Sequence, residues 1–241
     1  MGIYNTVIVE SIVLLGLCLV AAILLRGRVH WGWLGGAIAL YAVHKFLLFL
    51  GVAGLYPDIL PGRYNWEGKI AGTVLVLVAG LMLFRGDRAA FGLTLAQSGP
   101  APRTGFAVAA FTAIATALFM WLYWPGVKSE PLAEWTYQLT MPSLDEELLY
   151  RGVLLLMLER AFRPTVNILG APLGFAALIV TAQFYVTHAL GVGPDWSISF
   201  VWGEIVPLIY AALWIHVRVA TGSLLLPILL HSWANTAGYL I

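Results

Sequence analysis

Residues 143–152 read Ser-Leu-Asp-Glu-Glu-Leu-Leu-Tyr-Arg-Gly and place three acids and an arginine at the start of an apolar helix. The chain around them is 61% hydrophobic and only 10% charged, with a mean hydropathy of +0.87. Soluble domains carry about 25% charged residues and about 45–50% apolar residues. The chain is therefore predicted to be a membrane protein. A charge at the centre of a spanning helix costs at least ~2.5 kcal/mol, so acids retained there indicate a function.

The apolar segments predict an all-α fold, a polytopic transmembrane helical bundle of about eight spans. Each segment is close to the ~20 residues that cross the hydrocarbon core. The sequence shows no internal repeat of the kind that marks many transporters and no linker, so we expect one integral-membrane domain over residues 1–241. The spans are predicted at residues 4–25, 31–54, 68–84, 104–124, 144–162, 168–190, 198–217 and 221–241.

The charges outside these spans predict the partners and the orientation. The net charge is +1 and no basic stripe is visible, so no nucleic-acid partner is expected and the lipid bilayer is the environment. Excess arginine follows the odd-numbered spans, and the positive-inside rule then places both termini outside the cytoplasm. We expect a multi-pass protein of a bacterial inner membrane. The arginines concerned are Arg26, Arg28, Arg85, Arg88, Arg103, Arg160, Arg163 and Arg218.

The acidic segment allows a structural and a functional interpretation. Pro142 and Ser143 predict a helix start, and Ser143 with Glu146 fits a capping box, which is the structural alternative for Glu146. Glu147 and Arg151 are four residues apart in the favourable order and are expected to pair. Adjacent residues on a helix point about 100° apart. Glu146 is therefore free to face a cavity, where it suits a general base.

Two later helices carry histidines that the predicted topology brings to a similar depth. His188 ends the sixth predicted span, and His231 lies within the eighth. Asn235 follows His231 by four residues and shares its helix face. Each residue alone is typical of packing or of an interhelical hydrogen bond. Together with Glu146 they form the residue set of a buried hydrolytic site.

Three ordered motifs resemble the CAAX-protease and bacteriocin-processing family of intramembrane endopeptidases, which includes the Ras-converting CAAX prenyl endopeptidases. The similarity covers roughly residues 140–241, and the first four spans correspond to the family only as apolar helices. The motifs are Glu146-Glu147-x-x-x-Arg151, Phe184-x-x-x-His188 and His231-x-x-x-Asn235.

The resemblance implies a glutamic-type intramembrane protease that needs no cofactor and cleaves a membrane-anchored peptide or protein. By position, Glu146 and His188 would activate a water, while His231 and Asn235 would hold the oxyanion. The remaining motif residues would have supporting roles. These are Glu147 and Arg151, which would orient the first acid, and Phe184.

Other functions remain open from the sequence. Glu146, His188 and His231 could instead ligate a catalytic zinc, although the compact His-Glu-x-x-His signature is absent. The same acids and histidines could relay protons in a transporter, or belong to a non-catalytic scaffold or immunity protein. Glu10, His44, Lys45 and Glu204 also lie within predicted spans. We expect Lys45 to pair with Glu10 or Glu204.

Overall fold

The computed structural model describes residues 3–26, 29–60, 64–123, 132–163, 165–201 and 205–240. Its first half consists of four apolar helices that match the first four predicted spans to within a few residues. Among the described residues, these four are long and apolar enough to cross a membrane by length and composition. They are α1 (Ile3–Leu24), α2 (Trp31–Val52), α3 (Trp66–Leu83) and α4 (Pro102–Tyr123).

The fifth span begins earlier than predicted. Helix α5 covers Leu132–Glu147, so Pro142 lies inside it and Ser143 is not an N-cap. The predicted helix start and the capping-box interpretation of Glu146 are therefore wrong. Packing against α9 overrides the local signal: Ser143 Oγ lies 2.8 Å from Ser232 Oγ of that helix and also donates to Thr140 O. Polar bonds of this kind hold helices together within a bilayer.

The acidic helix continues through a π-helical segment, Leu148–Leu154, into α6, Leu155–Ala161. Short π-helical segments within α-helices are found frequently at functional sites. All seven residues of this segment are buried, including Arg151. The segment directly follows Glu146 and Glu147 at the end of α5. The charged motif therefore lies in the buried centre of the bundle.

The last three spans are shorter than predicted. They are helices α7 (Phe175–Ala189), α8 (Ile205–Thr221) and α9 (Leu225–Thr236), and a short 3₁₀ turn (Ala237–Tyr239) follows α9. The predicted boundaries 168–190, 198–217 and 221–241 were wrong because hairpins and turns occupy the ends of these segments.

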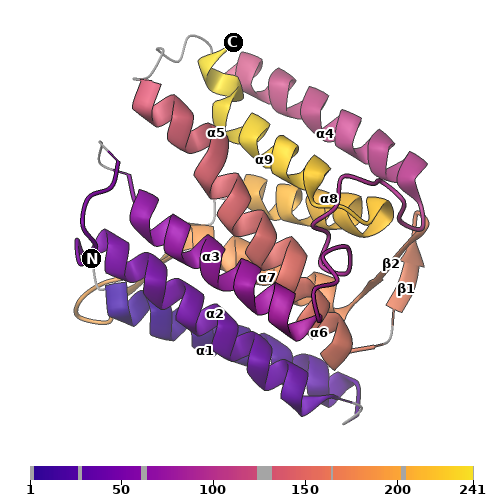
Figure 1. Ribbon diagram of the computed structural model, residues 1–241, viewed down its shortest axis with the longest axis horizontal. Helices are drawn as coiled ribbons and strands as arrows, with labels where there is room; N and C mark the ends of the chain where they lie inside the picture. The colour runs from indigo at the N-terminus through magenta and orange to yellow at the C-terminus, as the bar shows by residue number, and fades with distance from the viewer. Residues whose placement is uncertain are drawn as a thin grey trace.

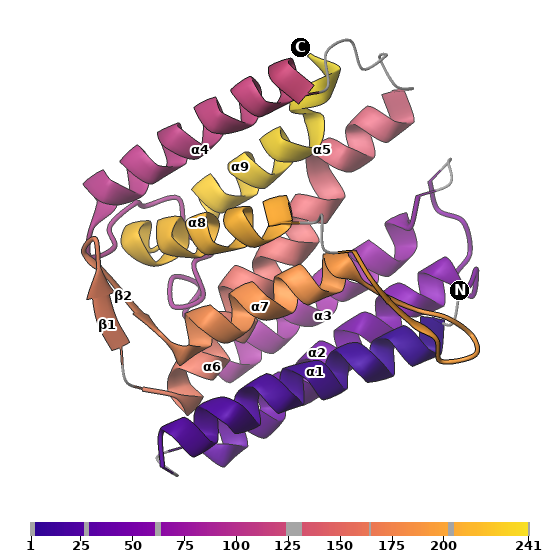
Figure 2. The same ribbon diagram turned by 180° about the vertical axis from the view of Figure 1, so that it is seen from behind.

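Two antiparallel hairpins flank α7, and neither was predicted. Strand β1 (Thr165–Ile168) pairs with β2 (Ala171–Gly174), with Thr165 opposite Gly174. Gly170 turns this hairpin at φ +85°, a conformation that suits glycine. Strand β3 (Leu190–Val192) pairs with β4 (Ile198–Phe200) after α7. The hairpins lie at opposite ends of the bundle (Figure 2).

The elements pack around the helix that begins with α5. Helix α3 contacts one side of α5 and α9 contacts the other, while α4 packs on α8 and α9 (Figure 1). Seen from behind, α7 lies between α1 and α8 (Figure 2). The all-helical membrane-type bundle is confirmed, and its arrangement surrounds the Glu146–Glu147 pair with α3, α7 and α9.

Candidate active site

The two adjacent glutamates of α5 have different environments. The Glu147 side chain is fully buried, whereas that of Glu146 is 17% exposed. Glu147 Oε1 accepts a hydrogen bond from Arg151 Nη1 at 2.9 Å, which confirms the predicted pair. Glu146 makes no contact with that arginine close enough to count as an ion pair in the described part of the chain. The arginine therefore holds one acid and leaves the other available, as the helix geometry predicts.

Glu147 also fixes His231. His231 Nδ1 lies 2.8 Å from Glu147 Oε1. Because a carboxylate only accepts hydrogen bonds, Nδ1 carries the proton of this bond. The other ring nitrogen, Nε2, then faces Glu146 Oε2 at 3.9 Å. Glu147 is thus the partner that orients His231.

His188 approaches the same carboxylate oxygen from the last turn of α7. Its Nδ1 lies 2.8 Å from the Phe184 carbonyl, which can only accept, so Nδ1 is the protonated nitrogen. Its Nε2 is 3.9 Å from Glu146 Oε2. Both imidazoles therefore turn their Nε2 atoms toward one oxygen, and that oxygen is buried and accepts no hydrogen bond from a described residue.

Phe184 packs at the base of this arrangement. Its ring centroid is 4.4 Å from that of His188 and 4.1 Å from the Arg151 guanidinium carbon. A guanidinium over an aromatic face is favourable, most of all where water is excluded. On the other side, Trp214 packs on the His231 ring at 4.9 Å. Aromatic side chains thus restrict the orientation of both histidines and of the arginine.

A cavity of about 370 Å³ opens beside the histidines, between α4, α7, α8 and α9. Asn235 lines it together with His188 and His231, and the rest of the wall is mostly apolar or aromatic. Glu146 is not among the lining residues, so the two histidines lie between its free oxygen and the cavity. The aromatic lining residues are Phe119, Phe184, Tyr210 and Trp214.

Contacts from three side chains to Asp145 and Glu146 were not predicted from the sequence. Lys69 of α3 donates to Glu146 Oε1 at 2.7 Å and to Asp145 Oδ2 at 3.0 Å. His44 Nε2 of α2 lies 2.7 Å from Asp145 Oδ1, and Thr73 Oγ1 lies at 3.5 Å. Lys69 lies at the start of the predicted span 68–84, and it is buried in α3. The only local signal that Lys69 is buried was its position about one turn after Trp66, on the helix face that also carries Gly72.

A second polar network lies between α1, α2 and α7. Lys45 Nζ pairs with Glu10 Oε2 at 3.1 Å, which confirms one of the two predicted pairings. Glu204, the other predicted partner, lies outside the described residues. Tyr41 donates to Glu10 Oε2 at 2.8 Å, and Gln183 donates to the Tyr41 hydroxyl at 2.7 Å. This network neutralises Lys45 and Glu10 without involving the two active-site histidines.

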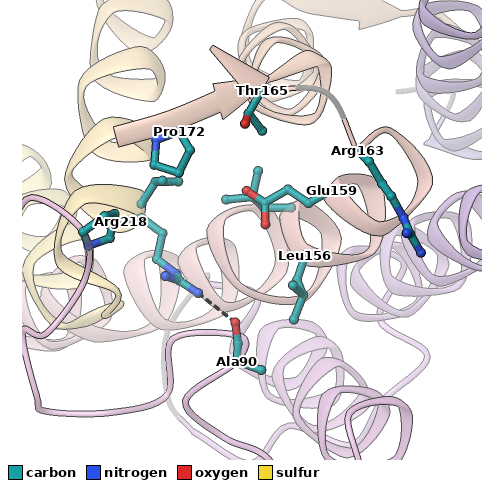
Figure 3. A pocket seen from close by; sticks show the side chains of 10 residues that line it. Ala90, Leu156, Glu159, Arg163, Thr165, Pro172 and Arg218 are labelled. Carbon is teal, nitrogen blue, oxygen red and sulfur yellow. Dashed lines mark hydrogen bonds between the residues drawn. The ribbon is translucent and has the colours of Figure 1, made fainter. Parts of the chain in front are cut away.

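A larger cavity lies away from Glu146 and Glu147, near the loop before α4. It measures about 540 Å³, and Figure 3 shows Glu159, Arg163 and Arg218 around it. Arg218 is tied to backbone carbonyls there, with Nη2 donating to Ala90 O at 3.2 Å (Figure 3). None of the predicted site residues lines this cavity. Cavity volume alone therefore does not identify the cluster around Glu146.

The protein is a helical membrane-type bundle that brings Glu146, His188 and His231 together. Residues 127–237 match the family model described as Type II CAAX prenyl endopeptidase Rce1-like. The match confirms the resemblance and supports an intramembrane protease as the general class of protein. Comparisons with curated proteins and with solved structures gave no match.

Proposed function

We propose that the protein is a glutamic-type intramembrane endopeptidase in which Glu146 and His188 activate a water. The observation that carries this proposal is the convergence of two imidazole Nε2 atoms, each at 3.9 Å, on the free oxygen of Glu146. Two polar atoms at this separation can both lie about 2.8 Å from one water oxygen. A buried water with two or more such partners is well held.

The reaction follows from the donors and acceptors in the cluster. Glu146, assisted by His188 Nε2, accepts a proton from the water as its oxygen attacks the peptide carbonyl carbon. The carbonyl oxygen becomes an oxyanion that accepts hydrogen bonds from His231 Nε2–H and from the Asn235 amide. The proton then passes to the leaving nitrogen as the C–N bond breaks, which yields a carboxylic acid and an amine, and these ionise to a carboxylate and an ammonium.

His231 must be doubly protonated for this role. Its Nδ1–H is already bonded to Glu147, so Nε2 can donate only if the ring is an imidazolium. Two carboxylates face the ring, Glu147 from one side and Glu146 from the other. This assignment gives Glu147 a defined supporting task.

The substrate is proposed to be a membrane-anchored peptide or protein. The matched family model is described as a prenyl endopeptidase, so a prenylated C-terminal CAAX peptide is the first probe to use. The mostly apolar and aromatic cavity beside His188, His231 and Asn235 is suited to an apolar segment of peptide. An unprenylated leader or sorting helix is the alternative of the same chemical class.

Zinc hydrolysis by the same residues is the alternative mechanism. Glu146, His188 and His231 are a ligand set that zinc accepts. The ammonium of Lys69, however, lies 2.7 Å from the other oxygen of that carboxylate, and two cations on one carboxylate repel each other. This contact favours the metal-free mechanism. Activity that disappears with chelator and returns with zinc would overturn that choice.

The test uses cells that express the parent or the Glu146→Gln variant. Membrane and secreted peptides are compared by mass spectrometry, and peptides that accumulate in the variant are offered to purified protein in proteoliposomes, alongside a farnesylated CAAX peptide. The proposal expects the parent to cut at least one of them and the variant to cut none. Equal cleavage by the variant would overturn it.

A further inference from the structure

We propose that Lys69 is a positioning residue that holds the Glu146 carboxylate in the orientation that cleavage requires. This inference rests on the proposed protease function. It also assigns a task in the active site to α3, which lies outside the residues that match the family model. The C-terminal half of the chain would then depend on the N-terminal half for its catalytic geometry as well as for packing.

The first support is the way Lys69 divides the two oxygens of Glu146. Its Nζ donates to Oε1 at 2.7 Å, while Oε2 stays without a donor among the described residues and faces both histidines. A carboxylate that rotated to use Oε1 toward the histidines would have to break this charge-assisted bond. Such bonds are roughly twice as strong as neutral ones. Lys69 therefore fixes which oxygen meets the water.

The second support is that Lys69 is itself held in place. Its Nζ also donates to Asp145 Oδ2 at 3.0 Å, and Asp145 Oδ1 lies 2.7 Å from His44 Nε2. Asp145 is fully buried and His44 is 1% exposed. The chain of contacts runs from α2 through Asp145 to Lys69 and then to Glu146. The Lys69 side chain has four rotatable bonds. It loses most of its conformational freedom because Asp145 and Glu146 both hold its ammonium group.

The third support is the space that α3 leaves for this chain. A Cβ added at Gly72 would lie 2.7 Å from His44 Nε2 and 2.9 Å from Asp145 Oδ1. Any side chain at position 72 would therefore displace the His44–Asp145 contact. The glycine allows the two helices and the acid to approach closely enough for the pair to form.

The charges around Glu146 are balanced only when Lys69 is counted. Asp145 and Glu147 are its neighbours on α5, and like charges at this distance repel in a low dielectric. The cations and ionisable groups around Glu146 and its two acidic neighbours come from five other elements. Lys69 on α3, His188 on α7 and His231 on α9 face Glu146 itself, whereas His44 on α2 faces Asp145 and Arg151 in the π-helical segment faces Glu147.

Lys45 offers a matched control for Lys69. Both side chains are 11% exposed, both lie in apolar helices, and each is paired with a buried or largely buried carboxylate. Lys45 is bound to Glu10 and Thr187, outside the proposed catalytic set. Lys69→Met and Lys45→Met thus remove similar buried ion pairs, and only the first removes a contact to Glu146.

The experiment measures kcat, KM and thermal unfolding of each variant in proteoliposomes. The probe is the farnesylated CAAX peptide, or the peptide that accumulates in cells carrying Glu146→Gln. We expect Lys69→Met to lower kcat roughly 100-fold with little change in KM, the size of loss that misplacement of a reacting group by about 1 Å causes. Lys69→Arg is expected to recover about a tenth of the parental kcat, and Lys45→Met to stay within about threefold of the parent.

The outcomes separate this inference from the protease proposal. If Glu146→Gln cleaves as well as the parent, the proposed function itself fails. If Glu146→Gln is inactive while Lys69→Met keeps the parental kcat, the inference fails and the function stands. Equal losses of kcat and stability in the two methionine variants, with no recovery in Lys69→Arg, would reduce Lys69 to a structural role. Should Lys69→Met fail to insert, Lys69→Gln against Lys69→Arg supplies the same comparison.

Discussion

Two polar clusters are buried in this protein, and they differ in what they leave unsatisfied. In the cluster around Glu10, one carboxylate meets one ammonium, and Tyr41 donates to the same oxygen at 2.8 Å. In the cluster around Glu146, Glu146 Oε2 and Glu147 Oε2 have no donor among the described residues, and two histidines turn toward the first of these oxygens. The first cluster stabilises the packing of helices, and the second retains an acceptor that chemistry can use.

The comparison shows that burial of charge is a poor guide to function by itself. Buried ion pairs contribute little net stability, and removing one partner is strongly destabilising. Both clusters also border a cavity, of about 370 Å³ beside His188 and His231 and of about 450 Å³ beside Glu10. What distinguishes the Glu146 cluster is the orientation of each imidazole by a bond at its other nitrogen. Replacing the Glu146 carboxylate should therefore abolish peptide cleavage. Substitutions around Glu10 should instead lower the free energy of unfolding.

The largest effect is expected from Glu146→Gln. An amide cannot accept the proton of the water, so kcat should fall about 10²- to 10⁴-fold, the range that general acid–base catalysis contributes. Single-turnover cleavage of the farnesylated peptide in proteoliposomes measures this. Glu10→Gln is the matched change in the other cluster and should retain activity. Comparable losses in both variants would erase the distinction between the clusters.

Arg151→Met should cost about 3–5 kcal/mol of unfolding free energy, because it leaves the buried Glu147 without its guanidinium. Denaturant unfolding in bicelles measures the loss. Adding Glu147→Leu should restore much of the stability and none of the activity, since His231 then loses the partner that orients it. Recovery of activity in the double variant would refute the role of Glu147.

Asn235→Ala should lower kcat by about 10²- to 10³-fold, the usual effect of removing one oxyanion donor, with KM nearly unchanged. The separation of kcat from KM is measured on the same peptide. Asn235 lines the cavity next to His231, and its amide makes no hydrogen bond to another described residue in the structure. A change confined to KM would make Asn235 a binding residue instead.

The smallest effect is expected from Tyr41→Phe. It removes the hydroxyl that donates to Glu10 and accepts from Gln183, at a cost of about 1 kcal/mol of unfolding free energy. The kcat for peptide cleavage should stay at the parental value. A loss of activity larger than the loss of stability would connect the two clusters.

The sequence predicted those parts of the site that depend on local spacing. The Glu147–Arg151 pair follows from an i,i+4 relation, and Glu146 points elsewhere because adjacent helix positions diverge. The four long helices follow from apolar length alone. Lys45 was expected to pair with an acid, and only the three-dimensional arrangement selects Glu10 among the described residues.

The sequence could not predict the contacts that join distant helices. Lys69 precedes Glu146 by 77 residues, and nothing in the local sequence at the start of the predicted span 68–84 indicates this partner. Pro142 resembles a helix start because proline removes an N–H, yet α5 continues through it while packed on α9. The hairpins before and after α7 shorten helices whose composition suits longer spans. In each case tertiary packing decided between local alternatives.

The central claim is that Glu146 activates a water between His188 and His231 for attack on a peptide bond. The most direct measurement is cleavage of the identified peptide in ¹⁸O-labelled water by purified parent and by Glu146→Gln, with chelator present, followed by mass spectrometry of the new carboxyl end. The account predicts one ¹⁸O atom in the parental product and no product from the variant. Labelled product from Glu146→Gln at the parental rate would contradict it.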